Sequence, residues 1–178
     1  MMKKIPNRIR VIVMVLTFFI SLKCVMVTYA EDCETGNAQS TYFEIYDKDG
    51  NLKSEGYLPA NEDEAKKEMQ TRGTMGFPSR TLSNGDVMQC YQSGNMKFVV
   101  NEGDFLSMTF GLDRTAYIYS GIAEWSGIEH IATSGGLTAG RSHNGRAVSH
   151  AAYYGFIRNA STEPVTVMFA NFTNPYLQ

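Results

Sequence analysis

Three histidines, His130, His143 and His150, lie close together in the sequence and raise the question of a metal site. Histidine is the commonest metal ligand in proteins. The dipeptide Asn144-Gly145, however, predicts a two-residue hairpin turn, which separates His143 from His150 by roughly 13 Å along the strand direction. The ligands of one zinc ion lie only about 2 Å from the metal. We therefore expect neither a metal site nor a cofactor.

The same hairpin would place Arg141, His143, Arg146 and His150 on one face as a basic patch. Arginine suits planar acceptors that take two hydrogen bonds at once, such as carboxylates. The patch therefore predicts recognition of an anionic group, either an acidic sugar or a carboxylate on a partner. The alternative is a hairpin face whose charges only keep the protein soluble.

Aromatic side chains give a second binding hypothesis, because several of them on one exposed face could stack against sugar rings. Tyrosines at strand spacing more often belong to the core, but Trp125 lies in a glycine-flanked stretch that is typical of a loop. The candidates for this platform are Tyr117, Tyr119, Trp125, Tyr153 and Tyr154.

Motifs of known catalytic sites are missing from the sequence, and we expect no catalytic residue. The chain has no Gly-x-Ser-x-Gly elbow, no His-Glu-x-x-His pair and no glycine-rich phosphate loop before a helix. The acidic couples Glu124 with Glu129 and Asp104 with Asp113 could serve a glycoside hydrolase. Any acidic protein offers such couples, so they carry little information.

The N-terminal segment predicts export. It opens with four basic residues, continues with an apolar run over 11–22 and ends with small residues at Thr28 and Ala30. This is the pattern of a secretory signal peptide, and we expect cleavage after Ala30. A membrane anchor that stays is the alternative, but it needs roughly 20 apolar residues, and Lys23 interrupts the run. The sequence thus predicts one secreted domain over 31–178, with no stable membrane span.

Charge changes with cleavage. The segment 1–30 holds five of the 16 Lys and Arg residues and none of the 18 Asp and Glu residues, which leaves 11 against 18 and a net charge of −7. Binding of phosphate backbones needs clustered Lys and Arg. We therefore exclude nucleic acid as the main partner.

Two cysteines, Cys33 and Cys90, remain after cleavage. In an oxidising compartment an even pair most often forms a disulfide. A bridge across a loop of this length stabilises a fold by roughly 4 kcal/mol in the chain-entropy model. Two buried free thiols are the alternative.

Two strands and a turn open the predicted fold. Thr41 to Asp47 and Leu52 to Leu58 read as a hairpin with a four-residue loop. In that register Glu44 lies opposite Lys53, which brings opposite charges together.

One helix is predicted over 61–72, where Asn61 can cap it, Glu64 completes a capping box and Gly73 ends it. Its apolar face is thin, so we expect it on the surface.

Short segments rich in Val, Phe and Tyr follow, separated by turns. Phe105 to Leu112 alternates apolar with small or polar residues, as in a strand buried on one side. Pro164 to Phe172 is apolar on both faces and should lie centrally, whereas the glycine-rich stretch from Ile131 to Ser142 predicts a mobile loop. Together these segments predict an antiparallel β-sandwich of jelly-roll or Greek-key type, with a barrel as the alternative.

The sequence therefore predicts a small secreted β-sandwich that acts outside the cell as a non-enzymatic binding module for a carbohydrate or a protein partner. Two other classes stay open. A secreted glycan-cleaving enzyme would show two facing carboxylates, and a structural or self-assembling protein would show an exposed sheet edge or apolar patch.

Overall fold

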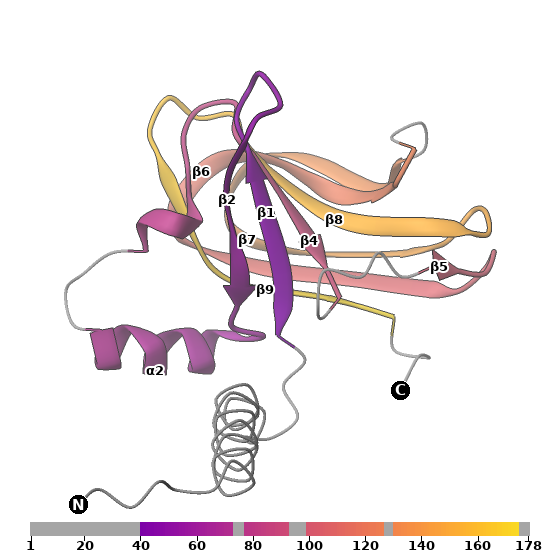
Figure 1. Ribbon diagram of the computed structural model, residues 1–178, viewed down its shortest axis with the longest axis horizontal. Helices are drawn as coiled ribbons and strands as arrows, with labels where there is room; N and C mark the ends of the chain where they lie inside the picture. Colours follow the sequence, from indigo (N-terminus) through magenta and orange to yellow (C-terminus); the bar gives the residue numbers. More distant parts are fainter. Residues whose placement is uncertain (1–39, 73–76, 93–98, 127–129, 175–178) are drawn as a thin grey trace, which may run out of the picture. The chain divides into compact units, whose positions relative to one another are not determined.

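Nine antiparallel strands carry most of the fold (Figure 1). The computed structural model describes residues 40–72, 77–92, 99–126 and 130–174. Along these residues the elements are β1 Thr41–Tyr46, β2 Leu52–Leu58, the helix α2 Glu62–Arg72, the 3-10 helix η1 Pro78–Arg80, β3 Thr81–Leu82, β4 Val87–Tyr91, β5 Val99–Val100, β6 Phe105–Glu124, β7 His130–Arg146, β8 Ala151–Asn159 and β9 Val165–Thr173. No helix in this part of the chain is long and apolar enough to cross a membrane.

The strands form one sheet in the order β2-β1-β4-β8-β6-β9-β3, with β7 added to β6 and β5 added to β8. The 20-residue strand β6 organises it: its first half pairs with β9, its second half pairs with β8, and β7 runs along its other edge. The sheet curls into a half-barrel around this strand. The predicted antiparallel β fold with one α-helix in the described residues is confirmed, whereas a jelly-roll sandwich is not.

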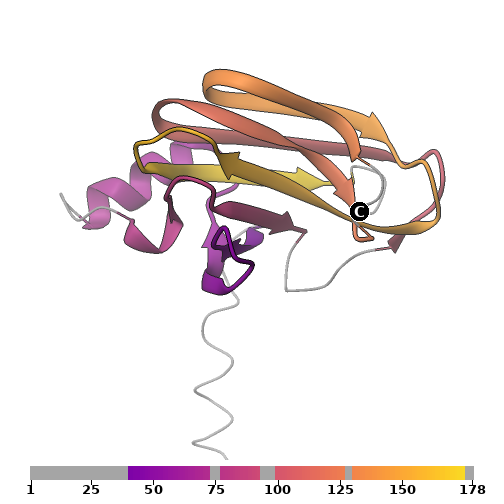
Figure 2. The same cartoon turned by 90° about the horizontal axis from the view of Figure 1, so that it is seen from above.

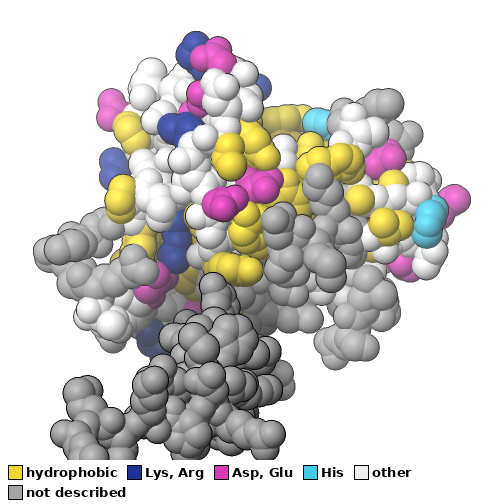
Figure 3. All heavy atoms as spheres, viewed as in Figure 1, with side chains coloured by type: hydrophobic (Ala, Val, Ile, Leu, Met, Phe, Trp, Pro, Cys, Tyr) yellow, Lys and Arg dark blue, Asp and Glu magenta, His cyan; other side chains and the backbone are white. Residues whose placement is uncertain are grey.

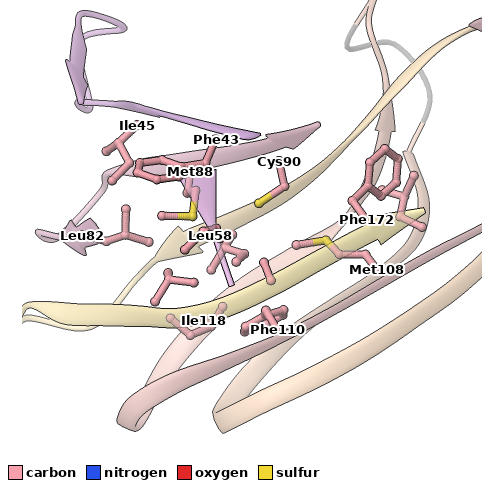
Figure 4. Packing of buried hydrophobic residues seen from close by; sticks show 14 of the residues in the cluster. Phe43, Ile45, Leu58, Leu82, Met88, Cys90, Met108, Phe110, Ile118 and Phe172 are labelled. Atoms are coloured by element: carbon pink, nitrogen blue, oxygen red, sulfur yellow. The ribbon is translucent and has the colours of Figure 1, made fainter. Parts of the chain in front are cut away.

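The core fills the inside of the curl and comes from alternate residues of each strand (Figure 4). Leu106, Met108 and Phe110 are at most 1% exposed, which confirms the predicted alternation in β6. In β9 only one side is fully buried, because the register shifts opposite Gly111 and leaves Phe169 partly exposed. The prediction that both faces of this strand are buried is therefore wrong. The other fully buried residues of the core include Phe43, Ile45, Met88, Cys90, Ile118, Ile122, Ile157, Val165, Val167 and Phe172.

The first hairpin forms at the predicted strands but in another register. Asp47 sets the turn, because its Oδ1 accepts the backbone N–H groups of Asp49 and Asn51, both at 2.9 Å. This turn is tighter than the predicted four-residue loop, and a β-bulge at Lys53 shifts the register further. Together they move the partner of Glu44 from a lysine to Glu55. The predicted charge pairing across this hairpin is thus wrong, and two carboxylates face each other instead.

Helix α2 begins as predicted. The backbone N–H of Glu64 donates to Oδ1 of Asn61 at 3.0 Å, and Glu64 in turn accepts the N–H of Ala60 at 2.9 Å. Gly73 lies outside the described residues. A buried arginine, Arg80, holds the helix against the sheet through two hydrogen bonds to Glu68, at 2.8 and 3.1 Å.

Strand β7 occupies residues for which the sequence predicts a hairpin turn and a mobile loop, and both predictions are wrong. Asn144 and Gly145 lie inside it, opposite Ser107 and Leu106 of β6, so no hairpin turn forms there. The stretch 131–142 is likewise strand and not a loop. Turn propensity is a local preference of a fraction of a kcal/mol per residue, and here the long alternating edge of β6 outweighs it by pairing along nearly the whole of β7.

Candidate functional site

One outer face of the sheet gathers tyrosines and carboxylates. Successive side chains of β1 alternate between the two faces, so Phe43 and Ile45 enter the core while Tyr42, Glu44 and Tyr46 point away from it. Acidic side chains lie among hydrophobic ones over β1 and β2 (Figure 3). We call this surface the tyrosine face; it comprises Tyr42, Glu44, Tyr46, Glu55, Tyr57, Gln89, Tyr91, Trp125 and Tyr154.

The aromatic rings of this face form a continuous chain across four strands and the residue after β6. Ring centroids are 5.4 Å apart for Tyr57 and Tyr42, and 6.1 Å apart for Tyr42 and Tyr91. From Tyr91 the chain continues to Trp125 at 6.3 Å, and Trp125 meets Tyr154 edge-on at 5.8 Å. These separations lie within the range that aromatic pairs prefer, so the rings support one another.

The two carboxylates, Glu44 and Glu55, lie directly opposite each other on β1 and β2. Tyr42 donates its hydroxyl to Glu55 at 2.8 Å, while Tyr46 and Tyr91 donate theirs to Glu44 at 2.7 and 2.9 Å. Among the described residues, no Lys or Arg forms an ion pair with either glutamate. Like charges that face each other across a ladder are destabilising, so the tyrosine hydroxyls stabilise a pair that would otherwise repel.

The tyrosines stay protonated over the physiological range. Burial raises the pKa of Tyr42 and of Tyr46 to about 12, and the hydrogen bonds to the neighbouring glutamates add to the effect. Burial raises the pKa of Tyr91 even further above its usual value. All three hydroxyls therefore act as hydrogen-bond donors and hold the carboxylates in place.

Exposure differs along the chain of rings. Tyr57 is 51% exposed and Trp125 is 43% exposed, whereas Tyr42 and Tyr91 are buried. The exposed rings thus lie on either side of the buried Tyr42 and Tyr91, whose hydroxyls hold Glu55 and Glu44. A ligand on this face would meet aromatic surface at either end and hydrogen-bond acceptors in the middle.

The predicted basic patch is not assembled. His143 is buried, its Nε2 lies 2.9 Å from Oγ of Ser120, and its ring stacks against Phe110. Burial lowers the pKa of His143, and the nearby Arg141 guanidinium adds to this, while a hydrogen bond to the backbone of Ala132 opposes it. His143 is therefore a packed core residue in its neutral form.

The other three members of the patch each have a different local partner and do not form one common surface. Arg141 shares the side of His143 but donates to Oγ of Ser134 at 2.7 Å. Arg146 pairs with Phe105 of β6, three positions on from His143, so it lies on the opposite face, where it donates to the backbone oxygen of Gly103. His150 lies in the turn after β7, with Nδ1 3.1 Å from Oδ1 of Asn101. Recognition of an anion by these four residues stays a prediction, but the four side chains do not share the face on which that prediction was based.

The aromatic residues of the sequence hypothesis overlap in part with the tyrosine face. Of its candidates, Trp125 and Tyr154 belong to the tyrosine face, and Tyr119 packs nearby against Phe156 at 5.5 Å. Tyr153 points into the core, where its hydroxyl accepts the backbone N–H groups of Val148 and Ser149 at 3.1 Å. The remaining candidate, Tyr117, is exposed within the second half of β6, outside the chain of ring contacts.

The sequence prediction missed the centre of the site, the residues of β1, β2 and β4. A signal was present, because the alternation of Tyr42, Glu44 and Tyr46 with apolar neighbours already marks an outward face. The pairing of Glu44 with Glu55 had no such signal, since it depends on the turn at Asp47 and on the β-bulge at Lys53.

Cys90 is completely buried, and burial raises the pKa of its thiol to about 12. Such a thiol is a poor nucleophile, because the thiolate is the reactive form. Its predicted disulfide partner, Cys33, lies outside the described residues, so the bridge stays a prediction. Within the described ranges, no three His, Cys, Asp or Glu side chains are grouped so that they could hold a metal ion.

A cleft of about 570 Å³ lies between α2, β6, β7 and β9, away from the tyrosine face. Met69, Leu112 and Phe169 line it, together with carboxylates of Glu62 and Asp113. Asp113 is engaged with Arg114 and with the backbone N–H of Thr166, so it serves the local fold.

The tyrosine face is therefore the site where exposed aromatic surface and fixed hydrogen-bond acceptors come together, which suits reversible binding of a polar ligand with apolar faces. Its pKa shifts keep hydroxyls protonated and do not create a nucleophile or a base. Comparison with models of protein families, with curated proteins and with solved structures found no match, so no relative assigns a function to this face.

Proposed function

We propose that this protein is exported and acts outside the cytoplasm as a non-enzymatic binding module that holds a carbohydrate on the tyrosine face. The continuous chain of rings from Tyr57 to Trp125, with Glu44 and Glu55 beside it, carries this proposal. The leader over 1–30, with its basic start and apolar run, supports the place of action.

Sugars match this surface in two ways. The apolar C–H faces of a pyranose ring stack against Tyr and Trp rings, while its hydroxyl groups donate hydrogen bonds to carboxylates. Glu44 and Glu55 also restrict which ligands can bind, because two carboxylates without a basic partner repel acidic sugars. The ligand class that fits is therefore a neutral or amino-substituted oligosaccharide, and not the acidic sugar that the basic patch predicted.

A glycan-cleaving enzyme is the second candidate, since Glu44 and Glu55 face each other. Carboxyl groups of retaining glycosidases lie about 5–5.5 Å apart, and directly opposed residues of two strands have similar spacing. We favour binding without cleavage, because three tyrosine hydroxyls donate to these carboxylates, which suits fixed hydrogen-bond acceptors.

A glycan array followed by calorimetry tests the proposal. We expect binding to neutral or amino-substituted oligosaccharides, weakened at least tenfold by Tyr57→Ala and by Trp125→Ala. Tyr117→Ala is the matched control, because Tyr117 is as exposed as Tyr57 but lies outside the chain of rings. An array on which no glycan binds, or equal weakening by all three variants, would contradict the proposal, and shortened glycans after incubation would favour the enzyme.

A further inference from the structure

Strand β7 is a long edge of the sheet. It has 17 residues and, within the described part of the chain, pairs only with β6 (Figure 2, in orange along the margin). The backbone groups on its other side therefore have no strand partner there. A strand edge of this kind is a template for pairing with another strand, and proteins usually protect it.

The remaining edges of this sheet are protected. Strand β2, at one end, carries the charged side chains of Lys53 and Glu55 and has a β-bulge at Lys53. Strands β3 and β5 have only two residues each. Charges, irregular backbone and short length are the devices that keep strand edges from associating.

Strand β7 is long, and its middle lacks the charges that protect β2. From Ile131 to Gly140 it contains no charged residue and no proline, and Leu137 is 72% exposed. Its residues with a positive φ are Ala132, at 52° near the start, and Gly136, at 147° beside Leu137. The large bulge opposite Ala139 consists of extra residues in β6, so the backbone of β7 is continuous at this point.

We propose that this edge pairs with β7 of a second copy of the chain, in antiparallel orientation about a two-fold axis near Leu137 and Thr138. Identical strands pair antiparallel through one shared patch, which is the commonest symmetry of homo-oligomers. In this register Arg141 of each copy lies opposite Ser134 of the other, so no like charges meet. A partner of another kind would be selected by charged side chains or by several large exposed ones, and in this stretch Leu137 is the one large side chain that is fully exposed.

The two-fold pairing joins two half-barrels into one continuous sheet and covers Leu137 in both copies. It leaves the tyrosine face of each copy unpaired, because β2, β1 and β4 lie on the far side of β8 and β6 from β7. The dimer would therefore present two ligand sites, and a multivalent glycan would gain affinity through the second site.

Light scattering coupled to size-exclusion chromatography, over roughly 1 to 500 μM of the purified protein, tests this inference. We expect the mass of a dimer, and at least a tenfold larger dissociation constant for Leu137→Lys. Leu52→Lys is the matched control, since Leu52 is an exposed leucine on the other edge strand, 52% exposed. Thr138→Pro is a second variant, which removes a backbone donor in the middle of the edge.

A monomer at every concentration would overturn the proposal. So would a dimer that persists unchanged in both Leu137→Lys and Thr138→Pro, or one that dissociates equally in Leu52→Lys. Circular dichroism of each variant confirms that the fold is intact, and the exposure of Leu137 makes this the expected result.

Discussion

At the scale of single residues, the tyrosine face depends on hydroxyl groups that hold two like charges close together. Tyr91 is central, because it is buried and its single hydroxyl lies within hydrogen-bond distance of both Glu44, at 2.9 Å, and Gln89. A sequence gives the alternation that turns Tyr42 and Glu44 outward, but it does not give the partner of Glu44 on the neighbouring strand. The register sets that partner, and here the turn at Asp47 and the β-bulge at Lys53 changed it.

Tyr91→Phe removes this donor and keeps the ring. We expect the free energy of unfolding to fall by about 1–3 kcal/mol, because the Glu44 carboxylate loses a hydrogen bond and is left facing Glu55. Urea denaturation at neutral pH measures the change. Tyr117→Phe, which alters an exposed tyrosine, should leave the midpoint unchanged. Equal stability of Tyr91→Phe and wild type would show that the hydroxyl does not stabilise the pair.

His143 should make the stability depend on pH. Burial lowers its pKa below the ordinary 6.5, so the unfolded chain takes up the proton more readily than the folded protein. The stability that neutral His143 supplies is therefore complete above pH 6.5 and is lost as the pH falls through the lower pKa of the folded state.

Denaturation at pH 7, 6 and 5 measures this loss. His143→Gln should give a flatter profile, because glutamine keeps a hydrogen-bonding group near Ser120 without titrating. His150→Gln, at an exposed histidine, is the control and should follow the wild type. A variant at position 143 with the wild-type slope would show that another group controls the pH dependence.

At the scale of elements, local signals predicted what local forces determine. The capping residues Asn61 and Glu64 placed the start of α2, and alternation placed β6. The failures are long-range. Asn144-Gly145 has the composition of a turn, yet β6 supplies a partner along the strand and the turn does not form. Arg80, which anchors α2 through Glu68, gave no signal at all, because nothing in the sequence around a lone arginine shows that it is buried.

Close approach of β6 and β7 gives a prediction at this scale. A Cβ atom at Gly140 would lie 2.7 Å from the backbone oxygen of Phe110 and 3.2 Å from Cα of Gly111. Gly140→Ala should therefore destabilise the protein by about 1–3 kcal/mol, as overpacking against backbone does. Gly135→Ala is the control in the same strand, because its Cβ would meet only the ring of Tyr119 at 3.4 Å. Thermal denaturation compares the two, and equal melting temperatures would contradict the close packing.

At the scale of the whole molecule, three features agree with one another. They are the proposed export, the net charge of −7 for residues 31–178 and the tyrosine face. An acidic module avoids anionic surfaces and nucleic acid, so its binding rests on aromatic stacking and hydrogen bonds. The fold class followed from the strand and turn pattern. The curl of the sheet did not, since it results from β6 pairing with two different strands along its length.

Intact mass spectrometry of the protein from its native host tests export and oxidation together. We expect a mass that corresponds to residues 31–178, lower by two hydrogens than the reduced chain because Cys33 and Cys90 are joined. Treatment with a reductant should restore those hydrogens. A chain that retains residues 1–30 with free thiols would contradict both expectations.

The most direct test of the central claim is a nuclear magnetic resonance titration of the isotope-labelled protein with a neutral oligosaccharide selected on the array. The proposal predicts shift changes concentrated on β1, β2, β4 and Trp125, with little change at the cleft beside α2. Changes centred on that cleft, or none at millimolar ligand, would contradict a carbohydrate site on the tyrosine face.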